Sequence, residues 1–254
     1  MARKKKSLFR ILAIPVLFLL LAGTATYYIS QYLNRPRFVR YKAFGIDIPV
    51  AYNIHGIDVS HHQDNIDWKA VQAMQASNIK MGFAFIKATE GLGRVDNAFR
   101  RNWFNIGQAN IPRGAYHYFI SSKSGKAQAE NFIETVQLLP GDLPPVLDVE
   151  AANGASAENI RSRVKDFLAL IEAHYKVRPI IYTYVDFYEH YLGKDFDAYP
   201  LWIAHYLVKD KPRIERDWLF WQHNEKGHVD GINALVDFNV FNGDSTEFKQ
   251  LLIK

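Results

Sequence analysis

The stretch PPVLDVEAAN at residues 144–153 combines a double proline, a short apolar run and two carboxylates that are two positions apart. The run has the length of a buried strand. It is followed by an amphipathic, helix-like stretch at 157–175 and by a second apolar run at 178–184. This order predicts a strand, a crossover helix and a parallel strand.

The same alternation continues on both sides of this unit. Strand-like runs followed by helix-like stretches give five pairs, at 54–78, 81–110, 113–139, 144–175 and 178–193. Three later apolar runs, at 200–206, 216–224 and 234–241, are separated by segments too short and too polar for long helices. We therefore expect an α/β fold, a modified TIM-like barrel of about five β/α units followed by three strands with short connections.

The N-terminal segment differs from the rest in charge. The chain has 254 residues and a net charge of +5, but residues 1–40 hold eight of its 31 basic residues and no acidic one. The remaining 23 basic residues face 26 acidic ones, so residues 41–254 carry a net charge of −3. A nucleic-acid partner is therefore not expected.

The basic cluster precedes 19 uncharged residues at 11–29. This pattern predicts a membrane-directed segment at 1–30, either an uncleaved single-pass anchor or a cleaved signal peptide, with the remainder outside the cytoplasmic membrane. We expect a juxtamembrane linker at 31–51 and one catalytic domain at 52–254. The chain has no cysteine, which excludes disulfides, thiolate metal sites and cysteine nucleophiles.

Two carboxylates end the strand at 144–150. Residues i and i+2 of a strand share a face, so Asp148 and Glu150 should both point into the barrel mouth, with Cα atoms about 6.5 Å apart. Two carboxylates this close raise the pKa of one of them, which places a general acid beside an anion. Glycoside hydrolysis uses such a pair. The plainer alternative is a strand-end pair that caps a helix or binds a surface arginine.

Polar and aromatic residues end nearly every other predicted strand, where barrel enzymes carry their chemistry. Asp58 and Asp237 end the first and last strands and should become neighbours when the barrel closes. We expect the remaining strand-end side chains to bind substrate, although each aromatic could instead pack in the core: Gln63, Lys87, Glu90, His117, Tyr118, Tyr182, Trp202, Trp221 and Gln222.

Nine motifs in order give the chain a family resemblance. It resembles the glycoside hydrolase family 25 lysozymes, the Chalaropsis-type muramidases, over about residues 54–243. Asp64 departs from the pattern, because glycine often follows the glutamine there, and this puts the local turn in doubt. The motifs are HGIDVSHHQ (55–63), IDW (66–68), FAFIKATEG (83–91), RGAYHYF (113–119), PPVLDVE (144–150), IIYTY (180–184), YPLWIAHY (199–206), FWQH (220–223) and VDGINALVDFNVFNG (229–243).

The resemblance implies hydrolysis of the β-1,4 bond between N-acetylmuramic acid and N-acetylglucosamine in peptidoglycan. It assigns the acid/base role to Glu150 and makes Asp148 an assistant in charge development, and it maps two further family carboxylates onto Asp58 and Asp237. Our hypothesis is net retention in which the substrate's own acetamido oxygen attacks C1. Direct attack by Asp148 or Asp58 is the rival mechanism.

Two other functions compete with hydrolysis. Asp58, His61, His62 and Asp64 resemble the ligands of a zinc polysaccharide deacetylase, but adjacent histidines of an extended chain point to opposite sides. The second is an envelope glycan-binding module without turnover. We expect a monomer with no cofactor and no metal.

Overall fold

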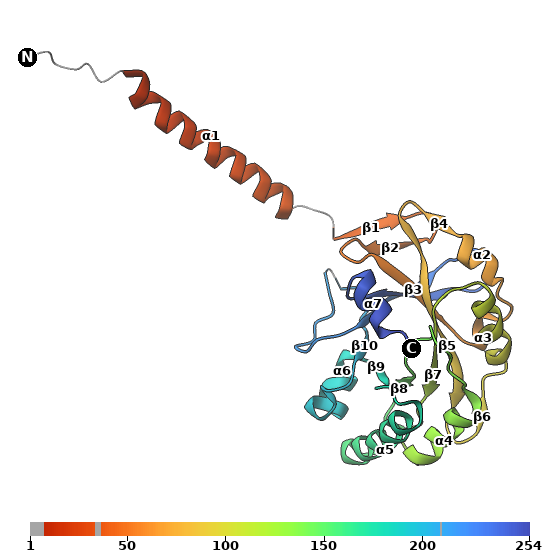
Figure 1. Cartoon of the computed structure of the whole chain (residues 1–254). Coiled ribbons are helices and arrows are strands. Elements are labelled where there is room, and N and C mark those ends of the chain that lie inside the picture. Colours follow the sequence, from red (N-terminus) through yellow and green to blue (C-terminus); the bar gives the residue numbers. More distant parts are fainter. Residues whose placement is uncertain (1–7, 34–36, 209) are drawn as a thin grey trace, which may run out of the picture. The chain divides into compact units, whose positions relative to one another are not determined.

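The computed structural model describes residues 8–33, 37–208 and 210–254, and the chain divides into two compact units at residue 37 (Figure 1). The first unit contains helix α1 (Leu8–Leu33). Among the helices of the described residues, α1 included, none combines the length and the apolarity that a membrane span requires. The expected anchor at 11–29 therefore gains no support, and the basic residues at 3–6 lie outside the described residues.

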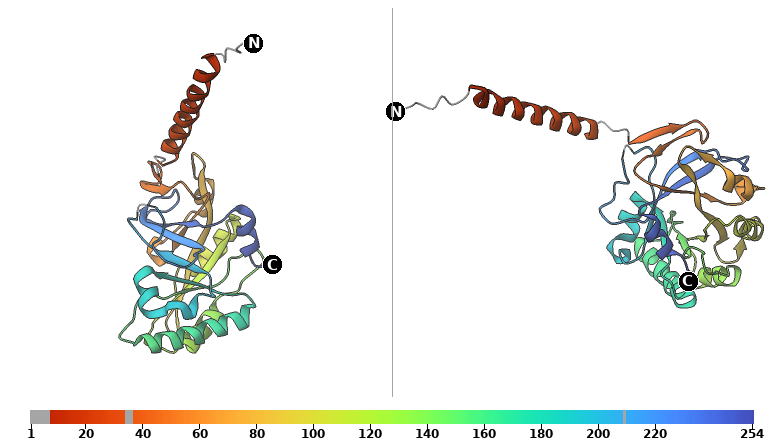
Figure 2. Two further views of the ribbon diagram at one scale, coloured as in Figure 1. Left: turned by 90° about the vertical axis from the view of Figure 1, so that its left-hand side faces the viewer. Right: turned by 45° about the horizontal axis from the view of Figure 1, so that its top comes forward.

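The second unit is a closed barrel of eight strands (Figures 1 and 2). Every neighbouring pair is parallel except the two pairs that β12 makes with β11 and β3. The pairing of β3 with β5 closes the barrel. The strands, in their order around the barrel, are β3 (Ile54–Val59), β5 (Ile79–Glu90), β7 (Arg113–Tyr118), β8 (Val146–Asp148), β9 (Ile180–Tyr184), β10 (Leu201–Ala204), β11 (Phe220–Gly227) and β12 (Val236–Phe241).

Five β/α units come first, as predicted. The helices after β3, β5, β7, β8 and β9 are α2 (Trp68–Ala73), α3 (Phe99–Gln108), α4 (Gly125–Thr135), α5 (Ala157–Tyr175) and α6 (Val185–Phe187). A π-helical turn and a 3-10 turn, η2 (Tyr188–Leu192) and η3 (Gly193–Phe196), extend α6. Shorter elements are η1 (His61–Gln63), β4 (Gln75–Ala76) and β6 (Arg94–Val95). Among the described residues, no long crossover helix joins the last three strands, so the predicted barrel is confirmed.

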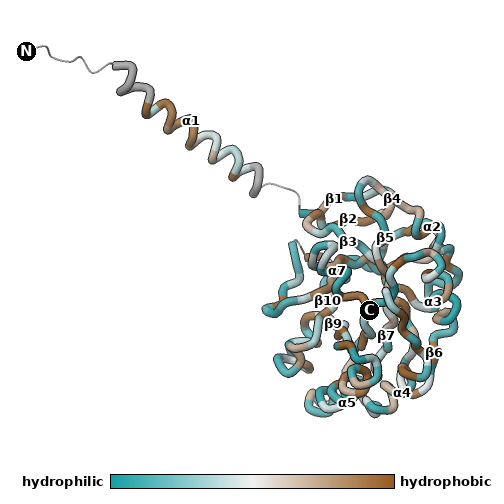
Figure 3. Tube along the Cα trace, in the orientation of Figure 1, coloured by the Kyte–Doolittle hydropathy of each residue, from teal (hydrophilic) through white to brown (hydrophobic). Residues whose placement is uncertain are grey.

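Helix α5 illustrates how the outer layer forms. The Ser156 side chain accepts a hydrogen bond from the amide of Asn159, which satisfies one free donor of the first turn. Hydrophobic and hydrophilic residues alternate along the helix (Figure 3), and Val164, Leu168 and Ile171 are buried. The spacing of three and four residues puts them on one face, which packs against the barrel.

Aromatic side chains fill the barrel interior. The ring of Phe85 stacks on Trp202 with ring centres 4.4 Å apart, and Phe83 packs beside it. Helix α7 (Ser245–Leu251) adds Phe248 to this cluster, with its ring centre 5.8 Å from that of Phe83. Asp244 and Glu247 form a capping box at the start of α7.

The segment before residue 52 differs from the expected linker at 31–51. Strands β1 (Phe38–Tyr41) and β2 (Ile46–Pro49) form an antiparallel hairpin that belongs to the second unit. Phe44 in its turn is fully buried, with its ring centre 5.4 Å from that of Phe238. The hairpin packs on the outer faces of β11 and β12 and shields their apolar side chains from water.

Candidate active site

A cavity of about 460 Å³ opens at the rim where the parallel strands of the barrel end. Five carboxylic acids and one lysine lie in its wall, together with aromatic and amide side chains. The lining residues are Asp58, Val59, Ser60, His62, Gln63, Lys87, Tyr116, Tyr118, Asp148, Glu150, Tyr182, Trp202, Tyr206, Gln222, Glu225 and Asp237. All four carboxylates expected to be catalytic therefore meet at one cavity.

Asp237 reaches this rim from the opposite chain direction. The expectation placed it at the end of the last strand, but β12 runs antiparallel to its neighbours and Asp237 stands near its beginning. It pairs in register with Asp58, the penultimate residue of β3. Residues directly opposite in an antiparallel pair project on the same side, so the two carboxyl groups meet as expected, for a different topological reason.

Strand β8 carries the central pair of acids. The strand ends at Asp148, Glu150 follows two residues later, and Val146 lies below them in the barrel interior. The Asp148 side chain is almost fully buried, and its Oδ1 has no hydrogen-bond partner among the described residues. A buried oxygen without a partner is costly to ionise. Because its acceptor positions are free, it is also available to a bound substrate.

Burial dominates the electrostatics of both acids on β8. It raises the pKa of Asp148 well above its usual range, and the charge of Glu150 raises it further. Burial also raises the pKa of Glu150, while Lys87 acts in the opposite direction on both groups. Glu150 can therefore hold a proton closer to neutral pH than an exposed glutamic acid can, as a general acid requires.

The second pair of acids behaves similarly. Burial and then the charge of Asp237 raise the pKa of Asp58 well above its usual range, against hydrogen bonds from Asn239 and Gln222 that lower it. Burial and then Glu225 raise the pKa of Asp237 to about 6. The two carboxyl groups also hydrogen-bond one another. A proton shared by the pair relieves the repulsion between two buried carboxylates.

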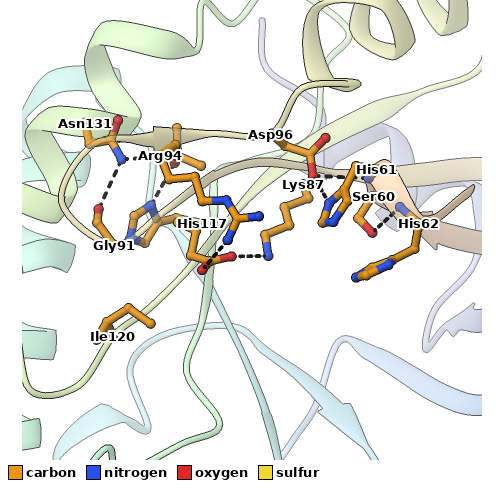
Figure 4. Close-up of polar contacts among 12 residues, drawn as sticks. Ser60, His61, His62, Lys87, Gly91, Arg94, Asp96, His117, Ile120 and Asn131 are labelled. Carbon is orange, nitrogen blue, oxygen red and sulfur yellow. Dashed lines mark hydrogen bonds and ion pairs between the residues drawn. The ribbon is translucent and has the colours of Figure 1, made fainter. Parts of the chain in front are cut away.

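Lys87 supplies positive charge to this acidic cavity. Its Nζ lies 2.7 Å from Glu90 Oε2 and 4.6 Å from the centre of the Tyr118 ring. Arg94 holds the other oxygen of Glu90 at 3.2 Å, and Figure 4 shows the two basic side chains converging. Partial burial of Glu90 is outweighed by these two cations, which lower its pKa. Glu90 therefore remains a carboxylate and fixes the position of the Lys87 ammonium group.

The geometry agrees with the comparisons with known proteins. The family model of glycosyl hydrolases family 25 matches residues 57–232, which is more than half of the chain. The chain belongs to this family. As a family 25 member it is a glycoside hydrolase, so the expected family and enzyme class are confirmed.

Relatives and solved structures extend the match over most of the chain. The protein YegX of Escherichia coli (strain K12) is 46% identical over 224 residues, which cover 88% of this chain and 81% of that protein. Lysozyme M1 of Streptomyces globisporus is 35% identical over 213 residues, covering 78% and 71%. The structure of a family 25 glycosyl hydrolase from Bacillus anthracis matches with a TM-score of 0.73 and 32% identity, and covers 81% of this chain and 96% of that one.

Most residues expected to bind substrate lie in the wall of the family 25 cavity. Gln63, Lys87, Tyr118, Tyr182, Trp202 and Gln222 line it. Three others do not, namely Glu90, His117 and Trp221. Glu90 stands behind Lys87, as described above. The structure therefore does not favour direct contact of Glu90, His117 or Trp221 with the substrate.

His117 and Trp221 point away from the cavity because neighbouring strand residues face opposite sides. His117 is buried outside the barrel between Thr89 and Gln128, its Nδ1 2.7 Å from the threonine hydroxyl, and burial lowers its pKa to about 4. Trp221 is fully buried, and its Nε1 donates to the carbonyl of His205 at 2.9 Å. Tyr118, which follows His117, and Gln222, which follows Trp221, face inward.

Several lining residues were not predicted, chiefly Ser60, His62, Tyr116, Tyr206 and Glu225. The period of two along β7 was a usable signal for Tyr116, because Tyr116 and Tyr118 must share a face. No sequence pattern marked Glu225, which follows an irregular pairing between β11 and β12.

The residues considered for a zinc site do not converge. His61 Nδ1 lies 2.7 Å from Asp96 Oδ2 (Figure 4), and the Asp64 side chain is 84% exposed. Within the described part of the chain, no group of three or more metal-binding side chains is placed to share one ion. Asp64 also has a φ of 49°, a left-handed conformation that favours glycine, which explains the glycine common in the family pattern here.

Proposed function

We propose that this chain is a peptidoglycan hydrolase, a lysozyme that cleaves the β-1,4 bond between N-acetylmuramic acid and N-acetylglucosamine. The observation that carries the proposal is the convergence of Asp148, Glu150, Asp58 and Asp237 on one cavity of a family 25 barrel. The similarity to Lysozyme M1 supports the substrate class.

The proposed mechanism assigns one step to each acid of β8. Glu150 gives its proton to the glycosidic oxygen as the bond to C1 breaks, and the acetamido oxygen of the substrate attacks C1. Asp148 stabilises the positive charge that develops on the acetamido group. Water then attacks C1 as the bond between C1 and the acetamido oxygen breaks, and it loses a proton to Glu150, so that the β-configuration is restored. Attack on C1 by a carboxylate, Asp148 or Asp58, is the rival scheme.

The reaction is tested on purified cell walls. Hydrolysis should lower their turbidity and create new reducing ends. Reduction of these ends with borohydride, followed by acid hydrolysis, should yield the alditol of muramic acid. The alditol of glucosamine would assign the cut to the other glycosidic bond. Sedimentation of the protein with walls that gain no reducing ends would identify a glycan-binding module instead.

The stereochemistry is tested by NMR of the first product formed. Both retaining schemes require the β-anomer to appear before mutarotation. Early formation of the α-anomer would contradict both schemes and indicate direct attack by water.

The deacetylase alternative predicts a different product. It would release acetate from the glycan, create no reducing ends and stop in EDTA. We expect reducing ends, no acetate and full activity after chelation, because the four acids provide the acid/base chemistry of glycoside hydrolysis by themselves.

We also propose that residues 1–30 direct the catalytic domain out of the cytoplasm. The support is the basic cluster followed by 19 uncharged residues. Cell fractionation with mass analysis of the N-terminus separates the two forms: an anchored chain keeps residue 1 and pellets with membranes, whereas a cleaved chain is shorter and soluble. A full-length chain in the cytosolic fraction would contradict export.

A further inference from the structure

Asp58 is held by two side-chain amides inside the barrel. Gln222 Nε2 and Asn239 Nδ2 both donate to Asp58 Oδ2, at 2.8 and 2.7 Å. Gln222 and Asn239 stand opposite each other on β11 and β12, and Asn239 is fully buried. Two N–H donors occupy the acceptor capacity of one carboxylate oxygen, so Oδ2 has no place left for a proton.

The direction of these bonds is set by a second layer of side chains. Trp202 Nε1 lies 2.8 Å from Asn239 Oδ1, and an indole N–H can only donate. The oxygen of Asn239 must therefore face Trp202, and its amino group must face Asp58. Gln222 is oriented in the same sense, because the hydroxyl groups of Tyr182 and Tyr206 both bond to its Oε1.

This arrangement decides where Asp58 can carry a proton. Because Oδ2 accepts from two donors, Asp58 can be protonated only at Oδ1. Two carboxyl groups can hydrogen-bond only when one of them carries a proton, and the carboxyl partner of Asp58 is Asp237. A continuous path of hydrogen bonds thus runs from Trp202 through Asn239 and Asp58 to Asp237. Three of its members line the cavity, whereas Asn239 does not.

We propose that Asn239, oriented by Trp202, is a positioning residue that confines the proton shared by Asp58 and Asp237 to Oδ1 of Asp58. Its meaning for catalysis rests on the proposed function, in which Asp58 serves the hydrolysis. The proposal also gives the polar atom of Trp202 a task inside the protein, in place of a hydrogen bond to the glycan.

The test uses Asn239→Leu, Trp202→Phe and the double variant, each labelled with ¹³C in the aspartate carboxyl groups. The carboxyl signals of Asp58 and Asp237 are assigned with Asp58→Asn and Asp237→Asn and followed across pH. Loss of a hydrogen bond to a charged group should raise the midpoint of the shared titration by about one to two pH units in Asn239→Leu. Trp202→Phe should give a smaller shift in the same direction, because the freed amide can still donate in one of its two orientations.

Turnover supplies a second, independent reading. Asn239→Leu should lower kcat on cell walls about tenfold to a hundredfold, with KM changed less than about threefold, because Asn239 does not line the cavity. The double variant should be no worse than Asn239→Leu alone, because Trp202 acts through Asn239. Additive losses would overturn the proposal and show that the Trp202 indole acts on the glycan itself.

The chain offers a matched control. Trp68 Nε1 lies 3.4 Å from Asn102 Oδ1 in a buried pair between α2 and α3, away from the cavity. Asn102→Leu and Trp68→Phe should lower Tm but leave the titration of Asp58 and Asp237 unchanged. An Asn239→Leu protein that folds and titrates like the wild type would overturn the proposal.

The proposal remains testable if Asn239→Leu does not fold. Trp202→Phe keeps an aromatic ring stacked on Phe85 and should therefore fold. The midpoint of the Asp58 and Asp237 titration is then compared between Trp202→Phe and Trp68→Phe. A midpoint that is unshifted in Trp202→Phe overturns the proposal. The titration needs no substrate. If the titration midpoint shifts as expected in the variants but the wild-type protein leaves cell walls intact, only the proposed function is contradicted.

Discussion

The charge of Glu150 depends on two opposing influences, burial and the ammonium group of Lys87. Burial favours the protonated acid, whereas Lys87 favours the anion. The result is a carboxyl group with a raised pKa that keeps a cation nearby, so it can lose its proton during the reaction and regain it afterwards.

Glu150→Gln removes the proton donor and should reduce turnover on cell walls about 10²- to 10⁴-fold. The measurement is the initial rate of reducing-end formation, with Tm as the check on folding. Glu130→Gln, a matched change at an exposed position of α4, should leave the rate unchanged. Near-normal turnover of Glu150→Gln would remove Glu150 from the acid role.

Lys87→Met should move the whole pH–rate profile to higher pH. Lys87 lowers the pKa of both Asp148 and Glu150, so its removal raises both. The active form of this coupled pair has one acid protonated and the other ionised, so both limbs of the profile shift in the same direction. Lys87→Arg keeps the charge and should keep the profile. A profile that falls in height without moving would show that Lys87 only contacts substrate.

At the scale of elements, the reversed direction of β12 is what completes the site. A parallel last strand would bring its C-terminal end to the rim, whereas an antiparallel one brings its beginning. Asp237 therefore meets Asp58 from the second position of β12, and Asn239 comes to stand one layer deeper, beside Gln222. The acid and the amide that orients its partner are two residues apart on one strand.

The turn after η1 contains a residue whose backbone conformation is costly. Asp64 has φ 49° and ψ −120°, a region that side chains other than glycine rarely occupy. Asp64→Gly should raise the free energy of unfolding by about 1 kcal/mol, after the extra chain entropy that glycine gives the unfolded state is subtracted. Chemical denaturation measures this directly.

Asp47→Gly in β2 provides the comparison for Asp64→Gly. Asp47 is exposed and lies in regular strand conformation, so glycine there relieves no strain and should destabilise the protein. Equal effects of the two substitutions would show that Asp64 stores no strain.

At the scale of the whole molecule, buried histidines make the fold sensitive to acid. Burial lowers the pKa of His223 to about 3 and that of His55 to about 4. In the described part of the chain, neither ring nitrogen of His223 finds a hydrogen-bond partner. The folded protein therefore binds protons at these sites more weakly than the unfolded chain, whose histidines titrate near 6.5.

The sign of the resulting pH dependence follows from these values. The stability is fully present above about pH 6.5 and is lost as the pH falls towards the folded-state values, by about 1.4 kcal/mol per pH unit for each histidine. His223→Leu removes one such site, so the decline of Tm between pH 7 and pH 5 should become shallower. His174→Leu, at an exposed position of α5, should keep the wild-type decline. An unchanged decline in His223→Leu would contradict this account.

The order of strands and helices, the five β/α units and the acids at the strand ends are predictable from the amino-acid sequence. They follow from local periodicity and from the short range of turn and capping interactions. The sequence also identified Asp58 and Asp237 as neighbours. Periodicity determines which residues of a strand share a face but not which face turns inward. Both members of adjacent pairs at strand ends were therefore expected in the cavity, and this was wrong for His117 and Trp221.

Three features emerge only in the folded barrel: the direction of β12, the packing of the hairpin at 38–49 on β11 and β12, and the two amides that bind Asp58. These features depend on contacts between residues as far apart in the chain as Asp58 and Asn239. Such contacts form when the barrel closes and buries polar groups that must find partners, and no local pattern along the chain records which partners they find.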